Sequence, residues 1–332
     1  MKIEHNNYCG YALNDLEEYT RRLDAHNMTI SANINRVLAK LIKRAQKFVL
    51  PPDGIVTLNF HETFSEADAE IVRLPYPVIA IEYAMKPRNH SEDFTSIVVS
   101  SSKRIALAFY KSALGDDLQY LEHMPGTLEY NEGIIVWPIS WLDKEKMWSP
   151  CWAGVIVPMP IQFTELDPHT VRIMDQTNVK HSNKALVVSK YLHGEYAMMT
   201  ADAHIESGND PVQMLSYDTE GELQSVISMC CALNCQNVEL QNAQIAKRKA
   251  TEKKSPKMYF EYKSLVLKPF EPKSVSESKG GTHAKPREHL RRGHFRRLRN
   301  GERMWFNDKT INLGVGKVEK DYYIKGDDDA RD

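Results

Sequence analysis

The first 50 residues contain two stretches in which apolar residues recur at helical spacing. Residues 13–25 form an acidic stretch with Asn14 at the position of an N-cap, and residues 31–49 form the second stretch. Pro51-Pro52-Asp53-Gly54 then ends the helical pattern. The pattern predicts an N-terminal helical pair within residues 13–49. The apolar positions of its second helix are Ile34, Val37, Leu38, Leu41, Ile42 and Ala45.

The pattern changes between residues 55 and 206, where short apolar runs alternate with turn residues. Runs rich in Val, Ile, Phe and Tyr that are bounded by Pro or Gly are typical of strands in an antiparallel sheet. We therefore predict a central, mostly antiparallel sheet over residues 55–206. Its predicted strands are residues 55–60, 78–83, 96–100, 105–110, 134–139, 153–157, 171–174 and 185–191.

The last third of the chain has a different character. Residues 220–234 have the spacing of a buried helix, and a basic arm follows at residues 247–254. A strand is predicted at residues 259–267, a Pro/Ser/Lys/Gly-rich linker at 269–281, and a hairpin from residues 303–307 and 310–315. The sequence thus predicts an α+β protein. It consists of a body, residues 1–240, and a small basic C-terminal module, residues 241–326.

Charge divides the chain in the same way. The whole chain is nearly neutral, with a net charge of −1, but residues 241–320 contain 21 basic and 8 acidic residues. A basic third attached to an acidic body suits a nucleic-acid surface. Docking of the two oppositely charged parts on each other is an equally good explanation.

Two groups of residues in the body allow either a binding role or a packing role. Trp137, Trp141, Trp148 and Trp152 could line a binding groove, although tryptophans more commonly fill a core. Cys231 and Cys235 share a helical face and could hold a metal ion, but no second Cys/His pair stands nearby. Buried packing is therefore expected for these cysteines, with no metal and no cofactor.

The sequence also bears on the cellular compartment. An odd number of cysteines, five, without a secretory signal indicates reduced thiols. No apolar run approaches the roughly 20 residues of a membrane span. We expect a cytoplasmic protein without a membrane partner.

The strongest chemical signal is an arginine-rich segment at residues 286–299, which contains six arginines and two histidines. Guanidinium groups stay charged and bind phosphate or carboxylate through paired donors. An anionic partner is therefore expected, with phosphate contacts from the arginines and base stacking by an aromatic residue. The candidate residues are Arg287, His289, Arg291, Arg292, Gly293, His294, Phe295, Arg296, Arg297 and Trp305.

Three roles remain open for this segment. Binding of nucleic acid or of an acidic peptide ranks first, and docking of the segment on the acidic body ranks second. In the third, His289 and His294 act as acid and base in RNA cleavage. A positive φ at Gly293 would turn these two histidines toward one site.

The same segment carries a family resemblance. His289-Leu290-Arg291-Arg292-Gly293-His294 is followed by Met304-Trp305-Phe306-Asn307, Gly314-Val315-Gly316 and Lys320-Asp321-Tyr322. This arrangement resembles a family of phage and prophage proteins that includes a type V-A anti-CRISPR acting on the nascent effector nuclease and its mRNA. Phe295 stands where that relative has a tryptophan, and Arg296-Arg297 depart from its pattern.

The resemblance implies a phage- or plasmid-encoded inhibitor rather than an enzyme. Its expected partners are a host protein or nascent peptide, together with the ribosome or mRNA, and its expected effect is lower expression of the host protein. The alternatives are a ribonuclease that uses His289 and His294, and a structural phage protein.

Overall fold

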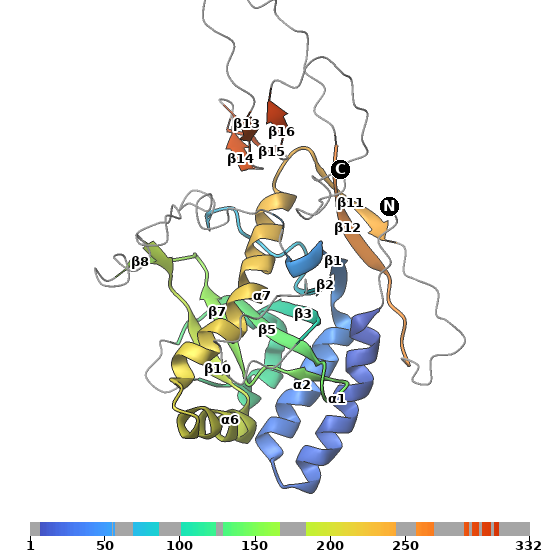
Figure 1. The fold of residues 1–332 in the computed structure, drawn as a ribbon, viewed down its shortest axis with the longest axis vertical. Coiled ribbons are helices and arrows are strands. Elements are labelled where there is room, and N and C mark those ends of the chain that lie inside the picture. Colours follow the sequence, from blue (N-terminus) through green and yellow to red (C-terminus); the bar gives the residue numbers. More distant parts are fainter. Residues whose placement is uncertain are drawn as a thin grey trace, which may run out of the picture.

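The computed structural model describes residues 7–54, 56, 69–85, 101–123, 129–166, 184–243, 257–268, 289–291, 294–298, 301–306 and 309–311. Two helices, α1 (Tyr8–Ala25) and α2 (Thr29–Arg44), pack against each other at the N-terminal end (Figure 1). The predicted helical pair is confirmed, but both boundaries differ from the prediction.

The start of α1 and the end of α2 are set by the rest of the fold. Helix α1 begins at Tyr8 because the buried Glu82 carboxylate accepts the N–H groups of Tyr8 and Cys9, a cap that comes from a distant strand. Helix α2 ends at Arg44, and the predicted helical continuation to residue 49 is wrong. Residues 46–49 instead form strand β1 (Gln46–Val49), which pairs with strands on both sides.

A ten-stranded sheet forms the centre of the molecule. Its strand order is β11-β12-β1-β2-β3-β5-β7-β10-β4, with β6 pairing β5. Strand β1 runs parallel to β2 and β12, and all other pairs in this sheet are antiparallel. The bounds are β2 (Val78–Ala84), β3 (Lys103–Tyr110), β4 (Glu122–His123), β5 (Gly133–Leu142), β6 (Met147–Pro150), β7 (Ala153–Pro158), β10 (Ser189–Leu192), β11 (Val238–Ala243) and β12 (Tyr262–Leu267).

The prediction of an α+β fold with a mostly antiparallel sheet is confirmed, and the sheet reaches beyond the predicted residues 55–206. Strand β1 precedes that range, whereas β11 and β12 follow it. The predicted strand 185–191 is divided into β9 (Lys184–Leu186) and β10, and β9 pairs separately with β8 (Phe163–Glu165). Only residue 56 of the predicted strand 55–60 is described, and the predicted strands 96–100 and 171–174 lie outside the described residues.

Helices cover both faces of the sheet, so its central strands are apolar on both sides. Successive residues of a strand point to opposite faces. Val78 and Ala80 accordingly pack in the core under α1 and α2, whereas Ile79 and Ile81 pack in the core that contains residues of helix α7 (Pro211–Leu233). Short 3-10 helices η1 (Pro52–Gly54) and η2 (Lys111–Tyr120) follow β1 and β3.

Two consecutive helices follow the last strand of the predicted sheet region. Helix α6 (Gly194–Glu206) lies where the predicted sheet was still expected to continue, so that part of the prediction is wrong. Its alanines and methionines favour a helix, and Ala197 packs with Leu215 of α7. Helix α7 begins at Pro211, where the Asp210 carboxylate accepts the N–H of Val212. The predicted helix 220–234 is its second half.

The tryptophans and cysteines of the body are mainly core residues. Trp137, Trp148 and Trp152 are buried, and Trp141 packs on Trp148 at a ring-centroid distance of 5.8 Å. None of the five cysteines forms a disulfide, and those of residues 230–235 belong to the core that contains residues of α7. Packing thus accounts for both groups.

Candidate functional site

The arginine-rich segment contributes to two short antiparallel strand pairs beyond the C-terminal end of α7 (Figure 1). Strand β13 (His289–Arg291) pairs with β16 (Lys309–Ile311), and β14 (His294–Arg297) pairs with β15 (Arg303–Phe306). The predicted hairpin between 303–307 and 310–315 is therefore wrong. The hairpin is β14–β15 instead, and its turn contains Gly301 at a φ of +84°.

The β14–β15 hairpin is attached to the body through β15. The Asn237 side chain accepts the N–H of Trp305 at 2.9 Å and donates to its carbonyl at 2.8 Å, while the N–H of Gln236 donates to the carbonyl of Arg303. The Trp305 side chain is 4% exposed and belongs to the main core cluster. Trp305 is thus an anchor, and base stacking by this ring would require it to leave the core.

The structure places the other predicted site residues by their backbone. His289 and Arg291 lie in β13, whereas His294, Phe295, Arg296 and Arg297 lie in β14. The two histidines therefore belong to different strand pairs. Arg287, Arg292 and Gly293 lie outside the described residues.

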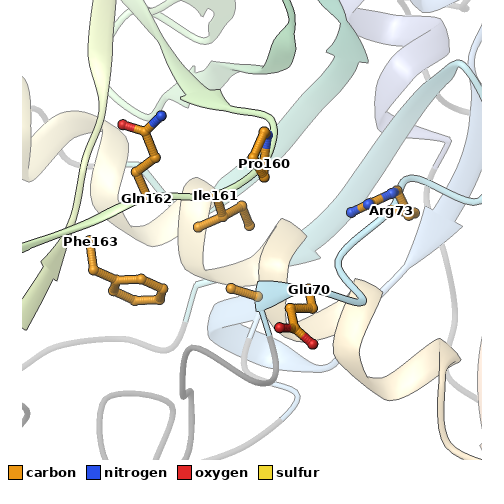
Figure 2. A pocket seen from close by; sticks show the side chains of 7 residues that line it. Glu70, Arg73, Pro160, Ile161, Gln162 and Phe163 are labelled. Carbon is orange, nitrogen blue, oxygen red and sulfur yellow. The ribbon is translucent and has the colours of Figure 1, made fainter.

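A groove of about 550 Å³ lies between residues 69–73 and residues 160–163. Figure 2 shows Glu70 and Arg73 on one side of it, with Gln162 and Phe163 on the other. A carboxylate, a guanidinium, a carboxamide and apolar side chains together suit the backbone and side chains of a peptide. No local pattern predicts this groove, because residues 69–73 and residues 160–163 are far apart along the chain. Only the fold brings them together.

A buried histidine, His193, connects the sheet to the N-terminal helices. It is 0% exposed, its Nε2 lies 2.9 Å from Asn35 Oδ1, and its ring packs against Trp137 and Tyr196. Burial lowers the pKa of this imidazole to about 4. Next to it, the Glu195 carboxylate accepts the N–H of Ser31 at 2.8 Å at the start of α2. His193 is therefore neutral near pH 7 and stabilises the fold in that form.

His193 makes stability fall on acidification. The unfolded chain binds a proton near the usual pKa of 6.5, whereas the folded chain does so only near 4. Neutral His193 therefore contributes about 3 kcal/mol to the free energy of unfolding above pH 6.5. This contribution is lost as the pH falls to about 4. Urea unfolding of the wild type and His193→Asn at several pH values measures it. The difference between the two chains isolates His193 from the carboxylates, and parallel pH profiles would contradict the assignment.

Neither a metal centre nor a membrane span is found in the described part of the chain. There, no three His, Cys, Asp or Glu side chains gather as metal ligands would. The helices found there are also too short or too polar to cross a bilayer.

Comparison with known proteins gives a family match. No curated protein and no solved structure matches the chain. Residues 48–311, well over half of the chain, match the model of the Anti-CRISPR type V subtype A2 family. The matched residues contain the groove, helices α6 and α7 and all four C-terminal strands, whereas α1 and α2 precede them. The chain therefore belongs to this AcrVA2-like anti-CRISPR family.

Proposed function

We propose that this anti-CRISPR protein lowers the expression of a type V CRISPR effector by binding a segment of that polypeptide during its synthesis. In this proposal the body binds the polypeptide, and the arginine-bearing strands contact the associated mRNA or ribosomal RNA. The family match supports the class of target. The His289–His294 signature resembles that of a relative that acts on nascent polypeptide and mRNA. This resemblance supports action during synthesis of the effector.

The attachment of the β14–β15 hairpin to the body is the observation that carries the proposal. Asn237 and the Trp305 ring hold β15, and the register then fixes Arg296 and Arg297 opposite Met304 and Arg303. A basic strand held on an acidic body can bind an RNA while the body holds a peptide. Arg291, Arg292, Arg296 and Arg297 would bind phosphate, while His289 and His294 would orient the RNA.

Replacing Arg291 and Arg292 together by Ala tests the RNA contact. We expect the reduction of effector mRNA in cells to be lost, at least about tenfold, because two phosphate contacts disappear. Effector protein and mRNA are measured in bacteria that express the effector with each variant. Salt-dependent binding of the purified variants to labelled RNA is measured in parallel.

Arg21 and Arg22 provide the matched control, since they are adjacent, exposed arginines of α1 that form salt bridges with Glu18. Arg21→Ala/Arg22→Ala should keep full repression. Persistent repression in the Arg291/Arg292 variant would contradict the proposed RNA contact. Cleavage of the RNA by the wild type but not by His289→Ala would replace binding by catalysis. Absence of both RNA binding and repression in the wild type would favour a structural phage protein.

A further inference from the structure

The outer surface of α6 and of the first half of α7 is unusually apolar. Seven large hydrophobic side chains in the described part of the chain are exposed, and five of them lie in these two helices. Helical spacing places Met198, Met199 and Ile205 on one side of α6, and a local concentration of this kind is typical of an interaction surface. The five are Met198, Met199, Ile205, Val212 and Tyr217, which are 48% to 62% exposed and which we call the α6–α7 face.

The same helices are acidic throughout. Residues 194–233 contain seven Asp or Glu and no Lys or Arg. Several of these carboxylates have partners within the fold, because Glu195 binds Ser31, Asp218 binds Trp152 and Glu222 binds Tyr83. Asp210 in addition accepts the N–H of Val212 at the start of α7. The exposed acidic residues of the same stretch are Asp202, Glu206, Asp210 and Glu220.

Methionine-rich surfaces with acidic borders suit one kind of partner. Flexible thioethers adapt to different apolar side chains, and carboxylates attract Lys and Arg. An amphipathic segment with apolar residues on one side and basic residues on the other satisfies both features. A second copy of the chain does not, because a symmetric contact would bring acidic residues against each other.

The chain's own basic strands lie at the opposite end of α7. Trp305 binds Asn237 just beyond the C-terminal end of α7, whereas α6 adjoins its N-terminal end (Figure 1). A helix of 23 residues separates the two ends by roughly 34 Å. The residues that flank the basic arm are also held elsewhere, since Ala243 pairs with Tyr262 and Lys257 binds Glu17 of α1.

We propose that the α6–α7 face binds a basic, amphipathic segment of the target polypeptide. This proposal rests on the proposed function and adds the surface and the chemistry of recognition. Apolar side chains of the segment cover Met198, Met199 and Ile205. Its Lys and Arg residues lie against Asp202 and Glu206.

The test uses the full-length protein and a fluorescein-labelled 18-residue peptide of Leu and Lys arranged as an amphipathic helix. Fluorescence anisotropy measures its affinity for the wild type and for two face variants. We expect about tenfold weaker binding for Met198→Ser/Met199→Ser/Ile205→Ser and for Asp202→Lys/Glu206→Lys, since each set removes one of the two attractions. The side chains are exposed, so both variants should fold, and circular dichroism checks this.

The matched control is Met258→Ser/Glu145→Lys, an exposed methionine and an exposed acid away from the face. Its affinity should equal that of the wild type, and a scrambled peptide without an apolar side should bind the wild type more weakly. This combination supports the α6–α7 face whatever the repression assay shows. If the face variants still repress the effector and bind the peptide as tightly as the wild type, the α6–α7 face is not the binding surface, and the proposed function stands.

Three other results would also overturn the proposal. The first is the absence of saturable peptide binding to the wild type. The second is a dimer in sedimentation that the face variants disperse, because a second copy would then occupy the surface. The third is tighter peptide binding in Lys247→Ala/Arg248→Ala/Lys249→Ala, because the chain's own basic arm would then be the occupant.

Discussion

Replacing Glu82 by Ala should destabilise the protein by about 3–5 kcal/mol, because it removes a buried carboxylate that accepts three hydrogen bonds. The carboxylate of Glu82 accepts the N–H of Tyr8 at 3.0 Å, the N–H of Cys9 at 2.6 Å and the hydroxyl of Tyr262. Burial raises its pKa, and the hydrogen bonds from Tyr262, Cys9 and Tyr8 act against this rise. Truncation would leave the start of α1 and the Tyr262 hydroxyl without their partner.

Chemical denaturation of the wild type and Glu82→Ala measures the loss as a lower midpoint at unchanged slope. Glu17→Ala is the control, since Glu17 also joins α1 to the segment before β12, through Lys257, but at the surface. It should cost less than about 1 kcal/mol. Equal costs for the two variants would show that burial of the carboxylate is not what matters.

Replacing Trp305 by Ala should release the β14–β15 hairpin from the body and abolish repression. Truncation of a buried tryptophan typically costs about 3–5 kcal/mol. A short hairpin held by Asn237 and Gln236 alone has little else to retain it. We expect new protease cleavage and fast hydrogen exchange at residues 294–306, with the central sheet still protected.

Trp305→Phe serves as the conservative comparison, because it keeps an aromatic ring in the core and both backbone bonds to Asn237. It should retain the hairpin and most of the repression. If Trp305→Ala keeps both the exchange protection and the repression, attachment of the hairpin does not underlie function. If it loses protection but keeps repression, the basic strands act without being held.

The local sequence pattern predicted an element correctly where the pattern and the tertiary packing favour the same structure. Residues 78–83 are a short apolar run rich in β-branched residues that directly follows Pro77, and β2 lies where it was expected. Residues 46–49 differ because their pattern continues that of α2, and only pairing with the distant strands β2 and β12 makes them a strand. The predicted hairpin failed in the same way, since composition does not choose the partner of β15.

Some features of the candidate site can likewise be predicted from the sequence, whereas others depend on the fold. The arginine signature is visible in the sequence because its composition is extreme, and so is the absence of Lys and Arg from residues 194–233. Trp305 was placed among the stacking residues because the sequence carries no mark of burial. Its contact with Asn237 joins residues 68 positions apart, a relation that only the fold establishes.

The hydrogen bond from Asn7 to the carbonyl of Met258 connects positions 251 residues apart. Ribosomes add residues from the amino end, so the start of α1 must wait for most of the chain to be made before it finds this partner and Tyr262. Contacts of such long sequence separation slow folding. The start of α1 is therefore expected to become fixed late in folding, only once the segment before β12 has been synthesised.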